Sequence, residues 1–161
     1  MAINFGDSSV QTFSSKIIQV KRSLRATQIV TTSSSYSDIT SLDFTPKSSS
    51  SVIHCEFTGN AYVAEEPGGV RVRFYDNDDG DRFGTSLHAS ESGPLVWRFD
   101  FHGGHTGNIY SYGGIVWRAQ ESSWGTSSKN IKVQLAQGGN GTVGFISEYL
   151  PCTFTITEVM E

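Results

Sequence analysis

Charged residues are scarce in this chain of 161 residues: Lys, Arg, Asp and Glu together make up 17% of it, and the formal net charge is -4. The 12 Lys and Arg residues are spread along the chain without a basic stripe, which argues against a nucleic-acid surface. No run approaches the roughly 18 apolar residues that a membrane helix needs. We therefore expect a partner that is neither a nucleic acid nor a membrane.

Two further shortages concern the N-terminus and the cysteines. The opening MAINFGDSSVQ lacks the basic start and the apolar core of a secretory signal peptide, so we expect the chain to fold in a cytosol. Only two cysteines are present, Cys55 and Cys152, and both fall on the apolar phase of predicted strands. We predict buried, inert thiols rather than a disulfide. A disulfide remains the alternative if the two strands are neighbours.

Ser, Thr, Gly and short runs of β-branched and aromatic residues dominate the sequence instead. Residues that favour long helices are few, whereas Thr, Val, Ile and aromatic residues suit a pleated, half-buried strand. About ten such runs are separated by turn clusters at residues 103–104, 113–114 and 138–141. This spacing predicts an all-β fold, an antiparallel, jelly-roll-like β-sandwich with a short extended N-terminal arm.

We place the arm at residues 1–15 and a single sandwich domain at residues 16–161, a length that one hydrophobic core can serve. Residues 52–57 and 70–75 alternate between apolar and polar side chains, which predicts strands with one buried face. In the run 36–44 this alternation slips near Asp38, where we predict a β-bulge.

Two clusters raise the question of a metal site. In the acidic cluster 76–81, setting Gly80 at position 6 of an EF-hand loop puts Tyr75 at position 1, so a solvated hairpin turn is favoured over an incidental metal site. His102 and His105 flank two glycines, which favours a loop tip, although one histidine per subunit could bind a metal on a symmetry axis. We predict no resident metal and no cofactor.

No set of residues points to catalysis. Gly-x-Ser-x-Gly and Walker-type phosphate motifs are absent, and Glu65 and Glu66 lie beside Pro67-Gly68-Gly69, where a solvated turn explains them. We predict that the chain is not an enzyme and has no catalytic residues. A small sugar-active enzyme, with two carboxylates about 5–10 Å apart across a cleft, is the weaker alternative.

Aromatic residues are the candidates for contacts with a partner. Trp124 lies in the polar stretch 121–125 and is the best candidate for an exposed ring. The predicted interface residues are Phe5, Phe13, Tyr110, Tyr112 and Trp124. Alternatively, sugars could stack on a set of rings formed by Trp97, Trp117, Trp124, Tyr110 and Tyr112, which would make the chain a carbohydrate-binding module.

Segments near the two ends of the chain resemble a known class of domain. They are SKIIQV (15–20), SSSYSDIT (33–40), FTPKSSSS (44–51), the ending TITEVME (155–161) and the opening INFGD (3–7). Together they are similar to small β-sandwich domains in virion proteins of tailed, cyanophage-like bacteriophages. Residues 60–140 are compatible only in their strand layout. The resemblance implies an oligomeric structural domain of the virion, on the capsid or on a tail fibre.

We expect the first of these two locations from the length of the chain. A fibre subunit of this type usually carries a shaft, whereas this chain is arm plus sandwich without coiled-coil heptads or collagen-like repeats. We therefore expect a capsid decoration (cement) protein, a homotrimer whose arm reaches the major capsid protein or other virion proteins. The alternative is a tail-fibre or receptor-binding subunit whose loops 102–114 and 121–127 contact host glycans.

Overall fold

The computed structural model describes residues 2–4, 10–12, 16–64, 68–78, 96–101, 111–122, 124–139, 141–146 and 151–160. Its elements are β1 (Ala2–Asn4), β2 (Val10–Thr12), β3 (Lys16–Arg25), β4 (Ile29–Thr31), β5 (Ser37–Phe44), β6 (Val52–Val63), β7 (Gly68–Asp76), β8 (Val96–Phe101), β9 (Ser111–Ser122), β10 (Lys129–Gln137), β11 (Val143–Ile146) and β12 (Cys152–Met160). Within these ranges no helix is long and apolar enough to cross a membrane.

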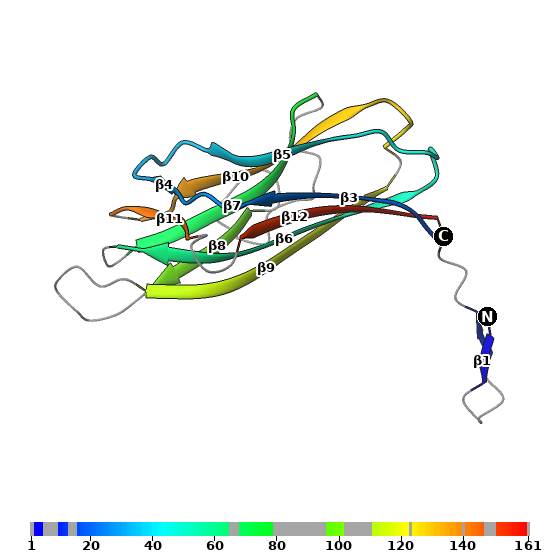
Figure 1. The fold of residues 1–161 in the computed structure, drawn as a ribbon, viewed down its shortest axis with the longest axis horizontal. Coiled ribbons are helices and arrows are strands. Elements are labelled where there is room, and N and C mark those ends of the chain that lie inside the picture. The colour runs from blue at the N-terminus through cyan, green and yellow to red at the C-terminus, as the bar shows by residue number, and fades with distance from the viewer. Residues whose placement is uncertain are drawn as a thin grey trace.

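Two antiparallel sheets form the body of the protein (Figure 1). The four-stranded sheet has the order β5-β10-β7-β8. The six-stranded sheet has the order β3-β12-β6-β11-β4, and β9 pairs with the other edge of β6 along its whole length. The inner faces of the two sheets enclose the hydrophobic core, so the predicted all-β sandwich is confirmed.

The strand order is that of a jelly roll. β12 pairs with residues 52–58 of β6 and β11 with residues 60–63, so β11 and β12 are two pieces of one row. β3 and β4, which pair with β12 and β11, form the outer row in the same way. In chain order, β3 with β4 is row 1, the strands β5 to β10 are rows 2 to 7, and β11 with β12 is row 8. The six-stranded sheet then has the row order 1-8-3-6 and the four-stranded sheet 2-7-4-5. This is the double Greek key of a jelly roll.

Period-2 alternation builds the core as the sequence predicts. Val70, Val72 and Phe74 are fully buried on β7, while the Arg and Tyr residues between them are half-buried on the other face. Ile53, Cys55 and Phe57 on β6 are also fully buried. Because successive side chains of a strand point to opposite faces, these two strands bring one apolar row each to the interior.

The predicted bulge is confirmed next to Asp38. On β10, the consecutive residues Val133 and Gln134 pair with Thr40 and Asp38, so Ile39 is an extra residue on β5. Ile39 is fully buried. The bulge therefore lets its side chain enter the core although it is out of phase with Leu42 and Phe44.

Both cysteines are free and buried, as predicted. The residue opposite Cys55 is Ile156, and Cys152 lies four residues away from it along β12, or about 13 Å at the usual rise of a strand. Neighbouring strands therefore do not bring the two sulfurs together. Burial raises the pKa of the Cys55 thiol well above its usual value; burial also raises that of Cys152, with the nearby Arg25 opposing the shift.

Gly59 marks a tight place between β6, β11 and β12. A Cβ atom at this position would lie 3.0 Å from Cys152 Sγ and 3.0 Å from Phe145 Cδ1. We expect Gly59→Ala to lower the free energy of unfolding by about 1–3 kcal/mol through overpacking. In a double-mutant cycle followed by urea unfolding, Cys152→Ala should restore part of this loss because it removes one of the two clashing atoms. Strictly additive losses would contradict this explanation.

The predicted arm contains a strand pair of its own. β1 and β2 are antiparallel, with Ala2 opposite Thr12 and Asn4 opposite Val10, and they share no sheet with the sandwich strands. The arm is therefore not extended along its whole length, because its two short strands satisfy each other's backbone groups. The boundary at residue 15 stays a prediction.

Candidate interaction surfaces

Trp124, the predicted exposed ring, belongs to the hydrophobic core. Only 4% of its surface is exposed, so the prediction of an exposed contact residue is wrong. The polar neighbours of Trp124 in the sequence gave no information about where its ring points. Gly125, which follows with a φ of 70°, turns the backbone immediately after it. The ring contributes to folding rather than to a partner surface.

The other predicted contacts are not tested by the described side chains. Phe5, Phe13 and Tyr110 lie outside the described residues. The backbone of Tyr112 lies in β9, opposite Tyr62. The candidate metal residues His102 and His105 and the carboxylates 65–66 also lie outside them, and the residues that are described hold no group of three metal ligands.

The acidic cluster 76–81 begins inside the sheet rather than in a turn. Asp76 is the last residue of β7 and is fully buried, so the prediction of a solvated turn is wrong at this position. Its Oδ1 accepts a hydrogen bond from the N–H of Asp78 at 3.0 Å. Asn77 and Asp78 form the turn itself, and residues 79–81 lie outside the described part of the chain. Asp76 therefore ends β7 and stabilises the turn that follows it through this hydrogen bond.

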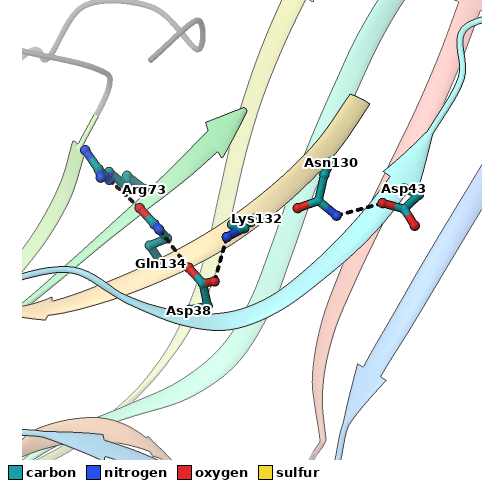
Figure 2. A network of polar contacts seen from close by, with 6 residues as sticks. All are labelled: Asp38, Asp43, Arg73, Asn130, Lys132 and Gln134. Atoms are coloured by element: carbon teal, nitrogen blue, oxygen red, sulfur yellow. Dashed lines mark hydrogen bonds and ion pairs between the residues drawn. The ribbon is translucent and has the colours of Figure 1, made fainter. Parts of the chain in front are cut away.

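A polar network crosses three strands of the four-stranded sheet (Figure 2). Arg73 Nε donates to Gln134 Oε1 at 2.8 Å, and Gln134 Nε2 donates to Asp38 Oδ1 at 2.7 Å. Lys132 Nζ lies 2.9 Å from the other oxygen of Asp38. The chain of contacts thus crosses β7, β10 and β5. Burial raises the pKa of Asp38, but the hydrogen bonds from Gln134 and Lys132 and the nearby positive charges lower it below its usual value.

Aromatic rings flank this network. The guanidinium carbon of Arg73 lies 4.0 Å from the ring centre of Tyr36 and 4.8 Å from that of Tyr75. Asn130 Nδ2 donates to Asp43 Oδ1 at 2.7 Å in a second cross-strand pair. Because the polar groups of this surface bind one another, we interpret the network as a brace that fixes the register of three strands. The partly exposed ion pair contributes only about 1 kcal/mol or less.

A second polar cluster surrounds Glu158, which is fully buried on β12. Its Oε1 accepts hydrogen bonds from Ser51 Oγ at 2.6 Å, from the N–H of Lys47 at 2.8 Å and from the N–H of Ser48 at 3.1 Å. Its Oε2 accepts one from Gln19 Nε2 at 2.7 Å. We call this set of residues the Glu158 clamp. It fastens the loop between β5 and β6 to β12 and β3.

The carboxyl group of the clamp is adapted to its buried position. Burial by itself raises the pKa of Glu158, but the hydrogen bonds from Ser51, Gln19, Lys47 and Ser48 together lower it below its usual value. Hydrogen bonds to the charged form favour that form. Glu158 is thus held as a carboxylate that accepts four bonds, which is a structural role and leaves no oxygen in need of a further donor.

A third feature is a row of exposed apolar side chains on β3 and β4. The exposed fraction is 61% for Ile17, 55% for Val20, 58% for Leu24 and 48% for Val30. Val20 and Leu24 are opposite Thr157 and Thr153, which alternate along β12 with its buried residues. They therefore point away from the core. We call these four residues the outer apolar row.

The comparisons with known proteins give no family for the chain. No protein-family model matches it, and no curated protein matches it either.

Proposed function

We propose that this chain is a non-enzymatic structural protein of a bacteriophage virion, a capsid decoration protein that works as an oligomer bound to other virion proteins. The observation that carries this proposal is the outer apolar row. Four large apolar side chains lie along one edge of the sandwich, each about half exposed or more. An apolar row of this kind is typical of a surface that another protein covers.

Three of the five segments that resemble virion domains lie close together in the fold. They form the first half of β3, the loop at residues 45–51 and the end of β12. The Glu158 clamp connects all three of them. In this chain the serine run and the C-terminal strand are thus joined to β3 through one buried carboxylate.

The alternative, a receptor-binding subunit that contacts glycans, rests on loops 102–114 and 121–127. Most of the first loop lies outside the described residues, and the one described tryptophan of the second, Trp124, is buried. We therefore favour decoration over glycan binding.

Cryo-electron microscopy of virions from the phage that encodes this chain tests the proposal. We expect regular copies of the sandwich across the capsid lattice, with the outer apolar row against another protein. Particles carrying Leu24→Ser should show lower occupancy, because this exposed side chain does not contribute to the core. A few copies at the tail would support the receptor-binding alternative, and particles that lack the chain altogether would refute a structural role in the virion.

A further inference from the structure

The edge strand β3 offers an unpaired backbone to a partner. It is ten residues long, Lys16–Arg25, and among the described strands it pairs only with β12. Figure 1 shows β3 beside β12 at the border of the six-stranded sheet. Ten residues of strand extend about 33 Å. Such an edge presents alternate N–H and C=O groups that an added strand can bind.

The charge of this strand is opposite to that of the rest of the chain. Residues 8–37 contain four cations and no Asp or Glu, whereas the other eight Lys and Arg are set against 16 Asp and Glu. All four cations lie on β3, at positions 16, 21, 22 and 25. A protein that is acidic as a whole therefore carries a positively charged edge.

No described carboxylate neutralises these cations. Lys21 Nζ donates to the carbonyl oxygen of Asp43 at 2.7 Å, and Arg25 donates to the carbonyl oxygen of Ile39 on the same strand β5. Arg22 reaches only the hydroxyl of Thr153, at 3.4 Å. Hydrogen bonds to neutral oxygens hold the side chains in place but leave their positive charges available to an acidic partner.

The two faces of β3 differ in character. Val20 and Leu24 are exposed on the outer face, with Arg22 between them. Lys21 and Arg25 lie opposite Ile156 and Cys152, which are buried, and so belong to the face turned toward the four-stranded sheet. A strand added beside β3 would place its own alternate residues on these same two faces. One of its faces would meet Val20 and Leu24, with Arg22 between them, and the other would meet Lys21 and Arg25.

This charge pattern argues against a second copy of β3 as the added strand. Two copies paired about a two-fold axis would place cations near cations without any acid between them, and like charges across strands are destabilising. We infer that β3 binds an extended segment of another protein in which Asp or Glu alternates with apolar residues. The inference rests on the proposed assembly role, and it adds the site and the chemistry of the partner.

Titration of the isotope-labelled full chain with a short synthetic peptide that alternates Val with Glu tests this inference. Amide shifts and slowed hydrogen exchange should be confined to residues 16–25, and the affinity should fall as salt is added, because exposed charges are screened. Lys21→Glu, at an exposed position on the cationic face of β3, should weaken binding about fivefold or more by replacing an attraction with a repulsion. The double variant Ser127→Glu/Ser128→Glu changes the net charge equally at exposed positions outside β3, and should bind normally.

Three results would overturn the inference: no response of residues 16–25 at millimolar peptide, a response elsewhere, or equal binding of a peptide with Lys in place of Glu. Thermal unfolding of each variant checks that it is folded. The virion experiment is independent of this one. Peptide binding at β3 by a chain that is absent from virions would leave the edge site standing and refute the decoration role. Full occupancy of Lys21→Glu on the capsid would refute the edge site alone.

Discussion

Glu158→Ala should lower the free energy of unfolding at pH 7 by about 3–5 kcal/mol, because buried donors left without an acceptor cost about 1–3 kcal/mol each. The N–H groups of Lys47 and Ser48 lose their acceptor in this variant, whereas the buried hydroxyl of Ser51 keeps only the carbonyl oxygen of Ser48, at 2.8 Å. Equilibrium unfolding in guanidinium chloride measures the change. A loss below about 1 kcal/mol would mean that water replaces the carboxylate and that the clamp is not a stabilising feature.

Glu158→Gln is the matched control, since its amide oxygen can still accept from the loop while the charge is gone. We expect a smaller loss of about 1–2 kcal/mol. The two variants together separate the acceptor role of the side chain from its charge. A loss in the glutamine variant as large as in the alanine variant would show that the charge itself is what holds the loop.

The clamp also predicts how stability depends on pH. The pKa of Glu158 is lower in the folded protein than its usual value, so the folded state binds its proton less readily than the unfolded chain does. Its stabilising contribution is fully present above the unfolded pKa of about 4.3 and is lost as pH falls through the lower folded pKa. The lowered pKa of Asp38 acts in the same direction. The difference between wild type and Glu158→Gln should therefore shrink on acidification, and a constant difference would contradict the assigned role.

Alternation of apolar and polar residues was sufficient to predict the sheets, because a one-residue shift would expose every core side chain of β7. The same logic placed the bulge near Asp38, and the structure shows that the extra residue on β5 is Ile39, which is buried. The strand order could not be predicted in this way, since many arrangements of strands bury the same faces.

The errors have a different origin. Trp124 was assigned from its polar neighbours, but the orientation of a ring in a loop depends on the space that the finished sandwich leaves for it. Glu158 was missed because its donors come from residues more than 100 positions away in the sequence. The exposure of β3 did leave a signal, namely four cations in ten residues without an acid, which is how edge strands commonly avoid pairing with copies of themselves.

Phe154→Ala should lower the free energy of unfolding by about 3–5 kcal/mol, the usual range for removing a buried aromatic ring. Phe154 is fully buried on β12, and its ring stacks on that of Phe74 on β7 with centroids 5.6 Å apart. This contact joins the two sheets, whereas Phe57 and Phe145 meet edge-on within one sheet. We therefore expect the cavity to weaken the attachment of one sheet to the other. Guanidinium chloride unfolding measures the effect.

Leu24→Ala is the control for this experiment, because it removes an apolar side chain of which 58% is exposed. Its free energy of unfolding should stay within about 0.5 kcal/mol of wild type. A small effect of Phe154→Ala would show that the sheets collapse onto the cavity, and a large effect of Leu24→Ala would show that the outer apolar row supports the fold. We expect a large loss of stability for Phe154→Ala and a small one for Leu24→Ala. This result would separate the side chains that hold the sandwich together from those on β3 that remain available to a partner.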